Sequence, residues 1–245
     1  MIKFFRKIRQ KLLQQNRITQ YLAYAIGEIF LVVIGILIAL QINNWQENKK
    51  LRAIELETLT EIQQALVQDI KVLDNNLFLL EKKKQQAQEL IDHIEEKQPH
   101  SKYFDRLMME VYYHRGYKTF NTAAFELLKQ RGFGIIQNNE LRNKITNHFT
   151  TDHSDIYSIL TRIENLNLLQ AENVFRNFRI SGKEPEQSII SAYDYDELLK
   201  DPRVFGPFYH FEVLIATYHS NLSSFRMKSE QTLNAVTAEL EQRKN

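Results

Sequence analysis

The stretch from Tyr21 to Ile42 contains one charged side chain, Glu28, in an otherwise apolar run of 22 residues. As an α-helix it would be about 33 Å long, close to the thickness of the hydrocarbon core of a bilayer. The alternative is a buried helix of a soluble protein, but such a helix usually keeps a polar face, and this stretch is apolar all round. We therefore predict a transmembrane helix over residues 21–43.

Charge flanks this stretch unevenly. Of 32 basic residues in the chain, six precede the apolar run, in a segment of 20 residues without any acidic residue: Lys3, Arg6, Lys7, Arg9, Lys11 and Arg17. The positive-inside rule then predicts a cytoplasmic N terminus and a periplasmic C-terminal domain, on a single-pass protein of the bacterial inner membrane. A cleaved signal peptide would have a shorter apolar region and a small-residue cleavage site, so we favour an uncleaved signal anchor.

Residues 1–20 also show helical amphipathicity, because Phe5, Ile8 and Leu12 recur at helical spacing among the basic residues. This pattern suits a helix lying on anionic membrane lipid at the cytoplasmic surface. The alternative is a basic patch that only sets the topology.

Two features of the apolar run suggest more than anchoring. Glu28 would lie about 10 Å into the span, where a carboxylate is costly and usually functional. It is our intramembrane functional candidate, unless the hydrocarbon core begins later and Glu28 reaches the interface. Small residues form a stripe that would let a second helix approach closely: Ala23, Gly27, Gly35 and Ala39. We predict homo-oligomers through this stripe.

The rest of the chain, residues 44–245, has the pattern of an all-α, antiparallel bundle of long helices. Residues 46–98 contain neither Gly nor Pro, which predicts a long first helix. Its apolar positions follow a 4-3 rhythm: Leu66, Ile70, Leu73, Leu77, Leu80, Ala87, Ile91 and Ile94. Asn138 or Asn139 opens a helix that should continue to about Phe178. Residues 181–207 hold three of the four prolines and are expected to form a loop.

The composition excludes several classes of function. The chain has no cysteine, which excludes a disulfide framework and a thiol nucleophile. The 30 acidic residues all follow the basic tail, so the large domain is slightly negative and does not suit nucleic acid. His148 and Asp152 would share a helical face while His153 points away, so we expect surface or capping histidines and no metal site. We find no catalytic motif and expect no cofactor and no enzymatic activity.

The N-terminal run from Met1 to Leu13 resembles an uncharacterised family of single-span inner-membrane proteins common in Bacteroidota genomes. The same family is suggested by the span, from Ala25 to Ile29 with its Gly-Glu pair and from Val32 to Trp45. The stretch from Phe125 to Arg142 is similar to the family's central segment, except that Gln130 and Arg131 stand where small residues are expected. The resemblance implies a domain of unknown function at the inner membrane and no known activity.

These patterns favour a non-enzymatic interaction or sensory module, a membrane-anchored helical bundle that forms homo-oligomers and binds a membrane or envelope protein or a small ligand. The alternative is an accessory subunit of a proton-driven or transport assembly, in which Glu28 titrates inside the membrane.

Overall fold

The computed structural model describes residues 18–112, 120–182 and 188–244. The chain divides into two compact units, Met1–Glu55 and Leu56–Asn245. The described part is helical apart from one two-stranded sheet and its connections, which confirms the predicted all-α class. The predicted domain boundaries at residues 20 and 43 stay predictions.

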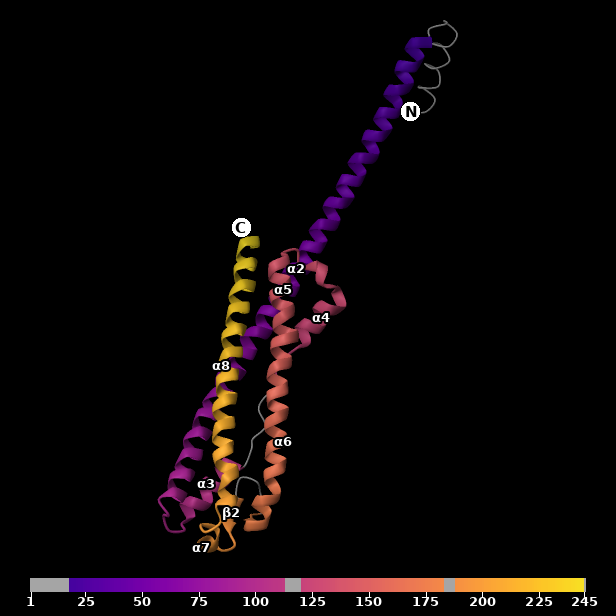
Figure 1. Ribbon diagram of the computed structural model, residues 1–245. Coiled ribbons are helices and arrows are strands. Elements are labelled where there is room, and N and C mark those ends of the chain that lie inside the picture. The colour runs from indigo at the N-terminus through magenta and orange to yellow at the C-terminus, as the bar shows by residue number, and fades with distance from the viewer. Residues whose placement is uncertain (1–17, 113–119, 183–187, 245) are drawn as a thin grey trace. The chain divides into compact units, whose positions relative to one another are not determined.

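The elements follow one another along the chain in a simple order (Figure 1). They are α2 (Ile18–Glu95), α3 (Lys102–Tyr112), α4 (Ala123–Arg131), the 3-10 turn η1 (Phe133–Ile135), α5 (Asn139–Asn147), the π-helix η2 (His148–Asp152), α6 (His153–Asn177), β1 (Phe178–Ser181), β2 (Ile189–Ala192), α7 (Tyr195–Leu198) and α8 (Pro202–Lys244).

Within the second unit, α8 packs antiparallel to α2. Three side-chain bonds join them from one end to the other: Gln63 Nε2 to Thr237 Oγ1 at 2.8 Å, Arg226 Nε to Asp74 Oδ1 at 2.5 Å, and Tyr209 Oη to Glu95 Oε1 at 3.3 Å. Residue numbers fall on α8 as they rise on α2. The succession α5, η2 and α6 runs beside α8 as a third long element, with Lys228 on α8 bonded to Asp152 (Figure 1).

A line of apolar side chains with a strict seven-residue period forms the core face of α2 in this unit. Its members are all buried: Leu59, Leu66, Leu73, Leu80, Ala87 and Ile94. Seven residues make nearly two helical turns, so these side chains lie one above another and face the neighbouring helices. They contribute to two separate apolar clusters, one containing Leu59 and Leu66 and the other containing Leu73 and the residues after it.

The segment expected as a loop, residues 181–207, contains regular structure. It holds β2, α7 and the beginning of α8, and β2 pairs antiparallel with β1, Phe178 opposite Ala192. Phe178 and Ile190 are buried in the second apolar cluster, which gives this short hairpin a core to pack on. Pro202 is the first residue of α8, a position where its missing N–H costs nothing.

The start of α5 resolves the two alternatives left by the sequence in favour of Asn138. Its Oδ1 accepts a hydrogen bond from Leu141 N at 3.1 Å, as an N-cap should. Its Nδ2 also donates to Glu239 Oε2 on α8 at 2.7 Å. Asn138 therefore both caps α5 and ties it to the last helix.

We predict that Asn138→Ala lowers the free energy of unfolding by about 2 kcal/mol, because it removes the cap and one bond to a carboxylate. The measurement is a denaturant titration of the full chain in detergent micelles. The matched control is Asn139→Ala, which changes the exposed neighbour one position later. Equal effects of the two substitutions would contradict the assignment of Asn138 as the cap.

Candidate functional site

Most of the apolar part of α2 is exposed in the first unit. Most large apolar side chains from Leu22 to Ile42 leave 45–70% of their surface accessible, among them Phe30, Leu31 and Leu37, whereas Ile34 is half-buried. Over the described residues, α2 is the one helix long and apolar enough to cross a membrane, judged by length and composition, and no residue of its most apolar window is buried. Such a segment fits a membrane anchor, because a soluble core helix would be covered.

The predicted association stripe lies in this segment. Gly27, Gly35 and Ala39 are exposed, whereas the side chain of Ala23 lies outside the described residues. A Cβ atom added to Gly27 or Gly35 would meet nothing within 4 Å. No contact in the described chain requires glycine at either position, although glycine inside a helix costs about 1 kcal/mol relative to alanine. Close approach of another helix would explain both glycines.

The structure describes only some of the other predicted site residues. Glu28 is half-buried within α2, and its role as a titrating group stays a prediction. The six basic residues of the tail lie outside the described residues: Lys3, Arg6, Lys7, Arg9, Lys11 and Arg17.

The second unit contains a site that sequence reasoning missed, a buried polar layer between the two apolar clusters. We define it by Asp69 on α2, His148 and His153 around η2, and Ser229 and Thr232 on α8. At this layer, the core residues of each helix pass from one apolar cluster to the other. On α2 the change falls between Leu66 and Leu73, and on α8 between Phe225 and Val236.

The π-helix brings the two histidines of this layer together. His148 and His153 are both buried, and their ring centroids are 5.2 Å apart at an interplanar angle of 87°. The expectation that His153 points away from His148 was wrong. It assumed α-helical spacing, whereas the i→i+5 bonds of a π-helix place residues five apart on nearly the same face. The expectation of surface histidines was wrong for the same pair.

The surroundings of these histidines are aromatic. The ring of His148 stacks on Phe225 at 5.2 Å and 6°, and His153 meets Phe225, Phe149 and Phe120 at 5.1–5.5 Å. Among the described residues, none of the four ring nitrogens has a hydrogen-bond partner. The nearest acid, Asp152, lies 3.7 Å from His148 Nδ1 and is bonded to Lys228. Both rings therefore pack as neutral aromatic groups.

Asp69 lies beside the same cluster. Its Oδ1 accepts a hydrogen bond from Asn121 N at 2.9 Å, one residue after Phe120, while Oδ2 has no partner among the described residues. Burial raises the pKa of Asp69 to about 6, and the bond from Asn121 opposes that rise. Burial lowers the pKa of His148 and of His153 to about 4. For His148, the neighbouring His153 and Lys228 add to this effect and Asp152 opposes it.

These groups do not form a metal centre or a catalytic triad in the described chain. No group of three or more His, Asp or Glu there could hold a metal ion.

A second cluster joins Ser191 Oγ to Asp105 Oδ2 at 2.9 Å and His100 Nε2 to Asp105 Oδ1 at 2.8 Å. A nucleophilic serine needs the histidine in the middle, to take its proton. Here the aspartate is in the middle, so the cluster ties β2 to α3.

The polar layer predicts the sign of the protein's response to acid. The pKa of each buried histidine in the folded protein is below its ordinary value of 6.5. The unfolded chain therefore binds protons more readily between pH 6.5 and about 4, so the contribution of each neutral histidine to the free energy of unfolding is present at neutral pH and is lost over this interval. Asp69 acts oppositely, since its folded pKa is raised. From pH 6.5 to about pH 5 we expect a net loss of about 2 kcal/mol from these three groups.

Replacing both histidines, His148→Phe with His153→Phe, should reverse this trend and leave a gain of about 1 kcal/mol from Asp69 over the same interval. Denaturant titrations of the full chain in detergent at several pH values measure the difference. The control is His210→Phe, at an exposed histidine on α8, which should follow the parent protein. An unchanged loss in the double variant would show that the two histidines are not the acid-sensitive groups.

Comparison with known proteins identifies the chain's family. No curated protein and no solved structure matches it. A family of unknown function, DUF6090, matches residues 28–151, which run from Glu28 into the π-helix and end at Thr151. The match includes the central segment from Phe125 to Arg142 and most of the apolar segment, whereas the N-terminal run from Met1 to Leu13 lies outside it. Because the match covers about half of the sequence, the chain belongs to the family of unknown function DUF6090.

Proposed function

We propose that this protein is a membrane-anchored helical interaction or sensory module without enzymatic activity of its own. The observation that carries the proposal is that α2 has two parts with different surfaces. One helix, Ile18–Glu95, contains a largely exposed apolar segment and, after Glu55, the central core line of the second unit. The first part has the properties of a bilayer span and the second those of a bundle helix.

We assign the anchor to the bacterial inner membrane, with residues 1–20 in the cytoplasm and the helical domain in the periplasm. The support is the charge distribution, since six basic residues and no acid precede the apolar segment, and both signs follow it. Trp45, at the end of the apolar segment, suits the membrane–water interface on the far side.

Interaction is the role that the described surface favours. Gly27 and Gly35 have open space where a side chain would be, in a segment whose surroundings would be lipid. In lipid, helices associate by close packing at small residues rather than by the hydrophobic effect. Self-association of the span would bring two or more helical domains together at one place on the membrane. The buried polar layer would then make the packing of each domain sensitive to conditions, because polar groups at core positions weaken a bundle and specify its register.

We predict that the full chain forms a defined oligomer in lipid discs and that Gly35→Leu weakens its self-association about tenfold or more. The leucine side chain would hold the two backbones apart. Mass photometry or light scattering of the discs gives the oligomeric state. The matched control is Ile36→Leu, which places a leucine one position further on, about 100° around the helix. A monomeric parent protein, or an unchanged mass for Gly35→Leu, would contradict self-association through this face.

A further inference from the structure

We propose that α2 turns about its own axis between two packings of the helical domain, one with an inner line of residues in the core and one with an outer line in its place. The inner line is Ile62, Asp69, Asn76, Lys83 and Leu90, and the outer line is the residue after each of these: Gln63, Ile70, Leu77, Lys84 and Ile91. The inference rests on the proposed sensory role and names the motion by which the domain would change state.

The two lines lie on either side of the seven-residue core line of α2, which includes Leu66 and Leu73. Each member of the inner line comes three residues after a member of the core line, and each member of the outer line comes four residues after it. With seven residues in two turns, these positions lie about 50° to either side of the core line. A turn of α2 by about 50° would therefore exchange the two lines and keep Leu66 and Leu73 facing the neighbouring helices.

The described packing buries polar groups in the middle of the inner line. Asp69 and Asn76 are each 1% exposed. Ile70 and Leu77, directly after them, are only half-buried. A carboxyl group and an amide in a core cost stability, whereas further burial of two large apolar side chains would add to it. At these two levels of the helix, the turned packing is therefore the more favourable one.

The ends of the two lines favour the described packing or neither. Ile62 is fully buried, and the turn would replace it with Gln63, whose Nε2 would lose its bond to Thr237 Oγ1. Leu90 and Ile91 are both buried, so exchange at that level is nearly neutral. Gains in the middle thus oppose a loss at one end, and two packings of similar stability are what a two-state element requires.

The polar side chains around Asp69 do not depend on its carboxylate. Ser229 Oγ and Thr232 Oγ1 on α8 each donate to a carbonyl four residues earlier in their own helix, at 2.9 Å. Asp69 Oδ1 accepts from Asn121 N, and Oδ2 has no partner within the described part of the chain. The turn would break the bond from Asn121 and bring Ile70 toward the aromatic rings that surround the two histidines.

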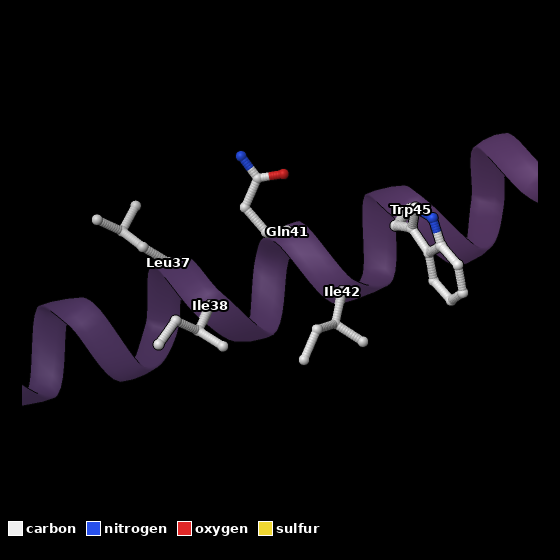
Figure 2. A pocket seen from close by; sticks show the side chains of 5 residues that line it. All are labelled: Leu37, Ile38, Gln41, Ile42 and Trp45. Carbon is white, nitrogen blue, oxygen red and sulfur yellow. The ribbon is translucent and has the colours of Figure 1, made fainter.

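The helix that turns is also the helix of the apolar segment. α2 is continuous over Ile18–Glu95, and Figure 2 shows Leu37, Gln41 and Trp45 projecting from a regular part of it. Because hydrogen bonds join successive turns of a helix along its whole length, a turn in the domain would rotate these side chains too. The two packings would then present different faces of the span to lipid or to a second span.

The distance between two spin labels measures this turn, because the chain has no cysteine of its own. The labels are attached at Lys71→Cys on α2 and Gln231→Cys on α8, both exposed positions. The full chain is placed in lipid discs and diluted with unlabelled protein, so that distances within one chain are measured. A label about 6 Å from the axis moves by about 5 Å when the helix turns by about 50°.

Two double variants bias the packing in opposite directions. Gln63→Leu with Lys84→Leu makes the outer line apolar throughout and changes no residue of the inner line. It should shift the main distance by about 5 Å. Asp69→Leu with Asn76→Leu removes the polar groups from the middle of the inner line and should give the distance of the described packing alone.

Circular dichroism shows whether each variant keeps the helical content of the parent protein. The same single distance in both folded double variants would overturn the turn of α2. If Gln63→Leu with Lys84→Leu does not fold, Gln63→Leu alone decides: a second distance supports the two packings, and one unchanged distance overturns them. Either negative result would leave the anchor and the self-association in place, since the Gly35→Leu experiment tests these separately.

Discussion

The helical domain depends on the packing of one line of side chains along α2. The line repeats every seven residues from Leu59 to Ile94, and it shares its two apolar clusters with side chains of α5, α6 and α8. A second line with the same period runs beside it and is apolar only at its two ends. Its members are Ile62, Asp69, Asn76, Lys83 and Leu90. Polar groups at core positions cost stability and fix which helices pair and in which register.

Asp69 and Lys83 show what this second line costs. Burial raises the pKa of Asp69 to about 6 and lowers the pKa of Lys83 to about 8, against the opposing effect of Glu110, so in each case burial shifts the equilibrium toward the uncharged form. The pair does not compensate itself, because fourteen residues of helix separate the two by about 21 Å. The buried histidines add two more polar groups at the level of Asp69. The two apolar clusters therefore stabilise the domain, and its stability depends on the protonation of the polar groups that lie between them.

Structural features that depend on composition and periodicity could be predicted from the sequence. Features that depend on tertiary contacts could not. The apolar segment, the all-α class and the apolar line on α2 could be predicted, because each is a repeated signal. Ile70 and Leu77, which continue the apolar rhythm, are only partly buried, and Leu77 packs against the second apolar cluster. Their neighbours Asp69 and Asn76 are fully buried, which the rhythm did not predict. Asn121, which bonds to Asp69 and follows Phe120, is 52 residues away in sequence. The π-helix was missed because periodicity analysis assumes α-helical spacing, and the hairpin was missed because its strands have four residues each.

We propose that one helix, α2, both anchors the chain in a bilayer and forms the core of the helical domain. Because the chain lacks cysteine, each introduced cysteine carries a spin label at one place. The most direct measurement is the accessibility of labels at Phe30→Cys, Val33→Cys and Leu37→Cys in vesicles, with the exposed Lys71→Cys as the aqueous reference. We expect the first three labels to collide with oxygen and to be shielded from a water-soluble nickel chelate. Collisions with the chelate as frequent as at residue 71 would contradict it.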